Sequence, residues 1–229
     1  MKERLLEITK EIHGSCMQTN RSTDSVRLIA VSKTNPVSAI QEAYNLGCRD
    51  FGENKVQEFL EKYSQLPQDI RWHMIGHLQR NKVKYIIDKV AYIHSIDSYE
   101  LALEVNRQAV KKGVPRVKVL IEVNIAREPS KYGVMIEDAP TLVQQIQGLE
   151  CLSLEGFMTV APYTENKEEN KQYFTSLLQL LVDINGKNID NRSISELSMG
   201  MSNDFPVAIQ CGATMIRVGT RLFGERDYN

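Results

Sequence analysis

The stretch Leu28-Ile29-Ala30-Val31-Ser32-Lys33-Thr34-Asn35-Pro36 decides the fold of this chain. Its first four residues are apolar and partly β-branched, and a polar turn with a proline follows, which predicts a short buried strand that delivers a lysine to the end of a sheet. Alternate residues of a strand face the same side, so Lys33 should share its side with Ile29 and Val31. A lysine in such a position is most often a solvated charge, and the remaining sequence must decide its role.

The same alternation of a short apolar segment and an amphipathic helix recurs along the chain. Seven further segments have strand character, and helical spacing of apolar residues separates them. The expected strands span residues 28–33, 50–53, 72–75, 91–94, 117–123, 152–158, 194–198 and 215–218, and the expected helices span residues 3–13, 37–44, 56–63, 83–87, 101–110, 136–147, 174–181 and 205–211.

This alternation predicts parallel strands joined by crossover helices. Eight such units of roughly 25 residues each favour a closed (β/α)₈ barrel of the TIM type, as a single domain that covers residues 1–229. The helix expected at residues 3–13 is additional to the eight units, and it could cover the place of a weak eighth helix. A doubly wound open sheet is the alternative.

Composition narrows the possible partners. The net charge is −1 with acids and bases interspersed, so nothing favours a nucleic acid or an acidic membrane as a partner. The N-terminus has no signal peptide pattern, and no apolar run approaches the roughly 20 residues that span a bilayer. We expect a cytoplasmic protein with a small-molecule ligand. Four scattered cysteines predict free thiols and no metal site: Cys16, Cys48, Cys151 and Cys211.

The usual location of active sites in (β/α)₈ barrels predicts where the candidate site residues lie. Active sites of such barrels lie at the carboxyl ends of the strands, which puts Lys33 in the mouth, and phosphate often binds in the loops after the seventh and eighth strands. The hydroxyls and glycines of residues 198–202 and of Gly219-Thr220 suit a phosphate, although the glycines could instead only permit tight turns. Arg217 should face the lumen, where a buried guanidinium needs a partner. Glu196 or Glu155 could be that partner.

A lysine, a phosphate loop and an inward arginine together describe a pocket for pyridoxal 5′-phosphate. Lys33 would form a Schiff base with the aldehyde, and Arg217 would face the pyridine nitrogen. An arginine there disfavours protonation of that nitrogen, so the ring would be a weak electron sink. We therefore do not expect strong carbanion chemistry.

Several segments resemble the pyridoxal phosphate homeostasis protein family, in matching order and over nearly the full length. The segments that carry this resemblance are residues 30–33, 51–58, 73–82, 130–134, 156–158, 197–202 and 217–224. The resemblance implies a barrel similar to the N-terminal domain of alanine racemase, of the type III fold of pyridoxal phosphate proteins. It further implies cofactor-binding roles for Lys33, Asn54, Met199, Gly200, Met201, Ser202, Arg217, Gly219 and Thr220. Arg221 and His77 depart mildly from the pattern.

The resemblance also implies a function in vitamin B6 homeostasis without established catalysis, and thus no catalytic residues. The related racemases take a second acid or base from a separate β domain, and this sequence ends at Asn229, soon after the eighth strand. We expect a monomer that stores the cofactor or delivers it to pyridoxal phosphate-dependent apo-enzymes. The alternatives are a weak amino-acid racemase and a barrel that binds a phosphorylated metabolite. His77, Gln79, Asn81 and Lys82 could line the mouth, and Lys82 and Lys131 could be secondary landing sites for the cofactor. His73 and His94 are expected to be structural.

Overall fold

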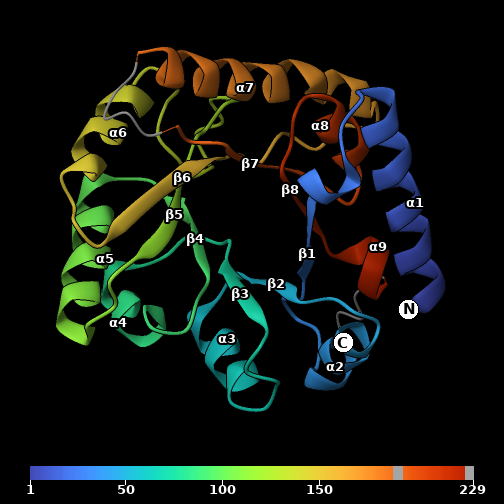
Figure 1. The fold of residues 1–229 in the computed structure, drawn as a ribbon, viewed down its shortest axis with the longest axis horizontal. Helices are drawn as coiled ribbons and strands as arrows, with labels where there is room; N and C mark the ends of the chain where they lie inside the picture. The colour runs from blue at the N-terminus through green and yellow to red at the C-terminus, as the bar shows by residue number, and fades with distance from the viewer. Residues whose placement is uncertain (188–192, 225–229) are drawn as a thin grey trace.

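Eight parallel strands form a closed barrel in which each strand pairs with the next and the last pairs with the first (Figure 1). The computed structural model describes residues 1–187 and 193–224. The strands are β1 (Arg27–Val31), β2 (Asp50–Glu53), β3 (Arg71–Met74), β4 (Tyr92–Ile96), β5 (Val117–Glu122), β6 (Leu152–Met158), β7 (Glu196–Met201) and β8 (Met215–Val218). The predicted (β/α)₈ barrel is confirmed, and the open sheet is wrong.

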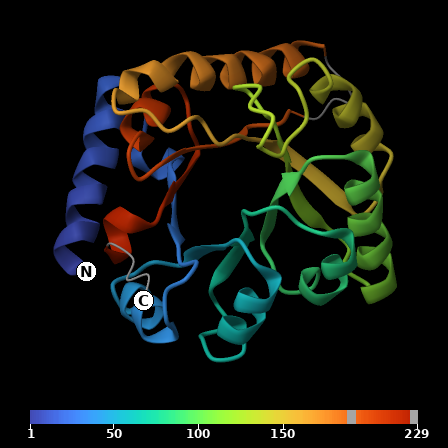
Figure 2. The ribbon, with the colours of Figure 1, turned by 180° about the vertical axis from the view of Figure 1, so that it is seen from behind.

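A ring of helices surrounds the strands. It consists of α2 (Val37–Asn45), α3 (Val56–Tyr63), α4 (Val83–Ile86), α5 (Tyr99–Lys112), α6 (Ala139–Gln147), α7 (Lys171–Gly186), α8 (Phe205–Gln210) and α9 (Thr220–Phe223), with short 3₁₀ turns η1 (Thr23–Ser25), η2 (Arg80–Lys82) and η3 (Lys167–Asn170). The N-terminal α1 (Lys2–Gln18) packs beside α8 and α9, which are both short (Figures 1 and 2). This N-terminal helix therefore covers the place of the weak eighth helix, as the sequence predicted. None of the described helices is long and apolar enough to cross a bilayer.

The strands are buried on both faces, as a parallel barrel requires. Their outward side chains join the helices in one large core, whereas a smaller apolar layer fills the lumen. The alternation is visible in β5, where Val119 belongs to the outer core and Leu120 to the lumen. The lumen layer is therefore a plug beneath the mouth, made of Ile29, Tyr92, Leu120, Met158 and Met215.

Several predicted boundaries were wrong, among them those of α6 and β7. Helix α6 begins at Ala139 rather than at residue 136, because Pro140 in its first turn starts the helix. Strand β7 spans Glu196–Met201 rather than residues 194–198, because the side chain of Asn185 bonds both backbone polar groups of Ile194 and ties it to α7. Residues 199–201 are consequently strand, where the sequence predicted a loop.

A buried lysine fixes the turn that follows β1. The Nζ atom of Lys62, in α3, donates to the backbone oxygen of Ser32 at 2.8 Å, to Glu53 Oε1 at 2.7 Å and to Glu58 Oε1 at 2.6 Å. Ser32 Oγ also donates to Glu53 Oε1 at 2.6 Å, and Glu58 accepts from the backbone N–H of Thr34. We call this set of hydrogen bonds among Lys62, Glu53 and Glu58 the clamp. It holds the backbone of Ser32 and of Thr34, the two residues on either side of Lys33.

The prediction that Lys33 ends the first strand was wrong, and this clamp explains why Lys33 lies in a turn instead. Strand β1 ends at Val31, and Thr34 adopts a left-handed φ of 64°. Burial raises the pKa of Glu53, and the hydrogen bonds from Lys62 and Ser32 oppose that rise. The position of Lys33 thus depends on a buried charge pair in which neither partner can be removed cheaply.

We expect Lys62→Met to destabilise the protein by roughly 3–5 kcal/mol, because it leaves Glu53 buried without a counter-charge. The free energy of unfolding in urea measures the effect. Lys89→Met is the matched control, since Lys89 pairs with Asp88 near the surface and its loss should cost at most about 1 kcal/mol. Equal losses in the two variants would contradict the importance of the buried pair.

Candidate functional site

The turn after β1 and the loop after β8 lie side by side at the mouth of the barrel. Strand pairing places Ile29 opposite Arg217 and Ala30 opposite Val218, so the chains leave the barrel together toward Lys33 and Gly219. The Lys33 side chain is half-buried, and its backbone oxygen accepts from Thr34 Oγ1 at 2.6 Å. The predicted neighbourhood of an amine and a glycine loop is thus present in the geometry.

A hydrogen bond joins the loops after β7 and β8. The N–H of Gly219 donates to Ser202 Oγ at 3.2 Å, and both residues are half-buried. Thr220 follows as an exposed residue at the start of α9. The backbone N–H of Met201 is engaged elsewhere, by Asp204 Oδ1 at 2.7 Å. Ser202, Gly219 and Thr220 therefore form one cluster of hydroxyl and N–H groups at the mouth.

The two glycines of these loops have different physical roles. Gly200 has a φ of 89°, and a Cβ there would lie 2.5 Å from Ala208 Cβ, so the backbone itself demands glycine. Gly219 has a φ of −112°, and a Cβ there would lie 3.4 Å from Val31, which is an ordinary contact. The protein's own packing does not require a glycine at 219, and its absent side chain leaves the backbone open to close approach, while its N–H donates to Ser202 Oγ.

Met199 contributes differently from the expectation, whereas Asn54 lies directly after its strand. The side chain of Met199 is fully buried in the outer core, because β7 continues through it and turns it away from the lumen. It can shape the site only through its backbone. Asn54 follows β2 and packs against Gly76, where a Cβ would lie 2.7 Å from the Asn54 backbone. Asn54 is half-buried near the end of the second strand.

Arg217 faces the lumen, as its position in β8 predicted, but its partners are neutral. Nη1 donates to Ser198 Oγ at 2.6 Å and Nη2 donates to the backbone oxygen of Thr159 at 2.7 Å, and the residue is 4% exposed. Burial lowers its pKa to about 10, which the acids Glu122 and Asp204 oppose. The guanidinium therefore keeps its charge at neutral pH without a direct salt bridge to any described residue.

The two acids suggested as partners of Arg217 lie elsewhere. Glu196 begins β7 and accepts from Thr214 Oγ1 at 2.6 Å, and Glu155 pairs with Arg116 at 3.2 Å. Both suggestions were wrong because Glu196 and Glu155 sit lower on their strands than Arg217. The sequence analysis missed Ser198 as the partner, although its place two residues after Glu196 on the same face was available as a signal.

Glu122 is a second residue that the sequence analysis missed. It ends β5 on the face of Leu120, is 9% exposed, and its carboxyl group makes no hydrogen bond to the side chain or backbone of any described residue. Burial raises its pKa to about 7, with the charge of Asp97 adding to the rise and Arg217 opposing it. Its position at the end of the clearest strand in the sequence was the available signal. The mouth thus contains a carboxyl group that is protonated in weakly acidic solution.

The side of the mouth above β3 to β5 carries a second polar group. His77 stacks on Tyr132 with ring centroids 3.8 Å apart, and its Nδ1 lies 3.2 Å from Asp97 Oδ2. Lys131 is paired with Glu128 at 2.7 Å. His77 and Lys131 therefore line the rim and interact with their own neighbours. Among the described residues, no group of three or more His, Cys, Asp or Glu side chains is arranged to hold a metal ion.

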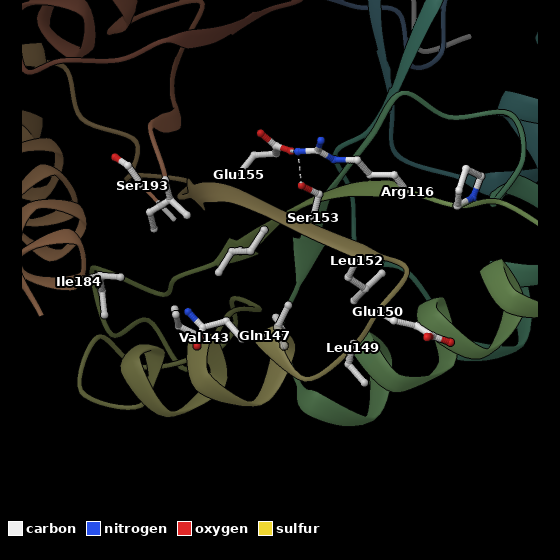
Figure 3. A pocket seen from close by; sticks show the side chains of 14 residues that line it. Arg116, Val143, Gln147, Leu149, Glu150, Leu152, Ser153, Glu155, Ile184 and Ser193 are labelled. Atoms are coloured by element: carbon white, nitrogen blue, oxygen red, sulfur yellow. Dashed lines mark hydrogen bonds and ion pairs between the residues drawn. The ribbon is translucent and has the colours of Figure 1, made fainter. Parts of the chain in front are cut away.

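One cavity lies away from this mouth. It measures about 620 Å³ and is lined by residues that precede β5 and β7 or begin β6, together with side chains of α6 and α7. Figure 3 shows Arg116 on one side of it, donating to Ser153 Oγ at 2.7 Å, with Leu149 and Ile184 among its apolar walls. Size alone does not identify the functional site, because this cavity contains none of the residues predicted to bind the cofactor.

Known proteins resemble the chain over nearly its whole length. The family model described as the N-terminal domain of alanine racemase matches residues 16–227. A relative from Aquifex aeolicus named pyridoxal phosphate homeostasis protein is 44% identical over 227 residues, which cover 99% of this chain and 98% of the relative. One from Escherichia coli with the same name is 36% identical, covering 98% and 96%.

Solved structures agree with these sequence relatives. PipY of Synechococcus elongatus, solved with pyridoxal phosphate bound, has 35% sequence identity and a TM-score of 0.84, covering 97% of this chain and 99% of PipY. An alanine racemase of Clostridium difficile has 15% identity and a TM-score of 0.68, covering 98% of this chain and 58% of the racemase. The latter likeness extends to the fold alone. Sequence, fold and the arrangement at the mouth agree, and the chain belongs to the family of the pyridoxal phosphate homeostasis proteins.

Proposed function

We propose that this protein binds pyridoxal 5′-phosphate at the barrel mouth and serves its storage or delivery in the cytoplasm, without strong catalysis of its own. One observation carries the proposal: an amine, a buried guanidinium and a glycine backbone N–H that already donates to the Ser202 hydroxyl lie together at the ends of the adjacent strands β8 and β1. The names of the relatives and the cofactor in PipY support it.

The donor groups at the mouth fit the cofactor. When bound, pyridoxal phosphate supplies an aldehyde that condenses with a primary amine, and Lys33 would provide that amine. The N–H of Gly219 and the hydroxyls of Ser202 and Thr220 would hold the phosphate, where a missing Cβ at Gly219 allows close approach. Arg217 would face the ring nitrogen.

The character of Arg217 favours holding the cofactor over transforming substrates with it. A guanidinium that stays charged opposes protonation of a neighbouring ring nitrogen, which weakens the ring as an electron sink. Racemisation also needs a second acid or base on the opposite face of the substrate. We therefore propose that the protein stores the cofactor and passes it to apo-enzymes in transient encounters. We further propose that it does so as a monomer.

We expect the purified protein to take up pyridoxal phosphate and to gain a visible absorption band. Borohydride reduction followed by peptide mass analysis should place the cofactor on Lys33, and Lys33→Ala should abolish the band. Lys55→Ala, at an exposed position after β2, is the matched control and should retain it. Failure of the unmodified protein to bind the cofactor would refute the proposal, and racemisation of amino acids beyond that by free cofactor would refute its non-catalytic part.

The two loop glycines give a second prediction. Gly219→Ala should fold with near-normal stability but bind pyridoxal phosphate roughly 10- to 100-fold more weakly, since a charge-assisted hydrogen bond worth about 1.5–3 kcal/mol is obstructed. Gly200→Ala should instead lower the melting temperature, because its backbone is left-handed and crowded. Titration of the absorption band and thermal unfolding measure the two effects. Unchanged affinity in Gly219→Ala would exclude phosphate contact at this N–H.

Glu122 predicts a dependence of stability on pH. Its pKa in the folded protein is about 7 against an ordinary value of 4.5, so the folded state holds a proton that the unfolded state releases. This contribution is fully present below pH 4.5 and is lost as the pH rises through 7. Glu122→Gln should therefore gain up to roughly 3 kcal/mol relative to the unmodified protein between pH 5 and pH 8. Urea unfolding at both pH values measures it, and a constant difference would contradict the shift.

A further inference from the structure

A continuous chain of hydrogen bonds crosses the lumen from the mouth to the opposite end of the strands. Its successive atom pairs are Arg217 Nη1 and Ser198 Oγ at 2.6 Å, Ser198 Oγ and His94 Nδ1 at 2.9 Å, His94 Nε2 and His73 Nδ1 at 2.9 Å, and His73 Nε2 and Asp50 Oδ1 at 3.0 Å. We call these five residues the lumen relay. Each of them is at most 5% exposed, so water does not compete for these bonds.

The far end of the relay determines which atoms donate. Burial alone would raise the pKa of Asp50, but hydrogen bonds from His73 and Arg71 outweigh it and lower the pKa to about 2. An ionised carboxylate only accepts hydrogen bonds. His73 must therefore carry a proton on Nε2, the atom that faces Asp50.

With both histidines neutral, the proton on His73 Nε2 determines which atom donates and which accepts in every other bond of the relay. A neutral imidazole has one donor and one acceptor nitrogen, so His73 Nδ1 accepts from His94 Nε2. His94 Nδ1 is then the acceptor of the Ser198 hydroxyl proton. Ser198 Oγ in turn accepts from Arg217, and all the bonds run in one direction, from the guanidinium to Asp50.

The groups around His73 keep it in this state. The ring packs against Tyr92, with parallel rings whose centroids lie 5.2 Å apart, and Asp50 faces its Nε2. Burial lowers the pKa of His73, the hydrogen bond to Asp50 opposes this, and the charges of Arg27 and Arg71 lower the pKa further. His73 is accordingly neutral at pH 7.

His94 is held neutral still more firmly. Burial lowers its pKa well below the ordinary value, and His73, Arg217 and Arg27 act in the same direction. An added proton on the histidine pair would place a hydrogen on His94 Nδ1, facing Ser198. The serine oxygen would then have to accept from both His94 and Arg217, and its own proton would need another acceptor.

We propose that the lumen relay holds Arg217 in one donor orientation at the mouth, so that Asp50 at the far end of the barrel partly sets the environment of a bound cofactor ring. This inference rests on the proposed function for the identity of the ligand. Asp50, His73, His94 and Ser198 are positioning residues, which act on the mouth only through Arg217. The far end is open to influence, because Asp50 also binds Arg71, whose side chain is 55% exposed.

The protonation pattern can be tested without any cofactor. Long-range proton–nitrogen NMR of the uniformly labelled protein should show His73 and His94 as neutral rings with hydrogen on Nε2 at pH 7. His13 and His77, the remaining histidines, provide reference signals in the same spectrum. Hydrogen on Nδ1 of either relay histidine, or a doubly protonated ring, would overturn the inference.

Coupling to the mouth requires substitutions. Asp50→Asn keeps an oxygen for His73 but removes the charge, and we expect it to weaken pyridoxal phosphate binding by roughly 2- to 30-fold and to shift the absorption band. Ser198→Ala removes the hydroxyl group that connects Arg217 to His94. In the Ser198→Ala background, Asp50→Asn should have no further effect on affinity or absorption. Additive effects, or no effect of Asp50→Asn alone, would overturn the inference.

A matched control separates the relay from general electrostatics. Asp69 lies just before β3, is 57% exposed in its side chain, and pairs with Arg49 outside the relay. Asp69→Asn removes the same charge and should leave binding and absorption unchanged, whereas a shift equal to that of Asp50→Asn would refute a specific path. If the unmodified protein binds no pyridoxal phosphate, the proposed function fails, and the histidine spectra still decide the state of the relay.

Discussion

A guanidinium buried in the lumen is the constraint on which the site depends. Arginine cannot shed its proton to ease burial, so the barrel must supply acceptors at the height of Arg217. It supplies Ser198 Oγ and the Thr159 backbone oxygen, and Ser198 faces inward from within β7. One strand thus contributes both to the barrel wall and to the polar interior that Arg217 needs.

The sequence predicted the barrel because its signals are local. Strand parity alone placed Arg217 in the lumen, and the polar turn placed Lys33 at the mouth. Parity could not identify the partner of Arg217, since partnership depends on the relative heights of residues on different strands. Glu196 and Glu155 have acidic side chains of the expected kind, yet they lie toward the other end of the barrel.

Other parts of the site required tertiary structure for a different reason. Lys62 has the spacing of an ordinary exposed helix residue relative to Glu58, and only the approach of α3 to β1 buries it. His73 and His94 each appear as an isolated histidine in a strand. Their meaning comes from side-chain hydrogen bonds inside the closed barrel, which join them to residues 23 and 104 positions away.

The closure of β8 onto β1 also has a consequence for how the protein is made. Arg27 pairs with Met215, so β1 can pair with β8 only after roughly 190 further residues have been synthesised. At 5–20 residues per second this takes about 10–40 s. Arg217 and Gly219 leave the ribosome among the last parts of the barrel. Lys33 is therefore synthesised long before the rest of the barrel mouth exists. A ligand can bind at this site only after synthesis of the barrel is complete.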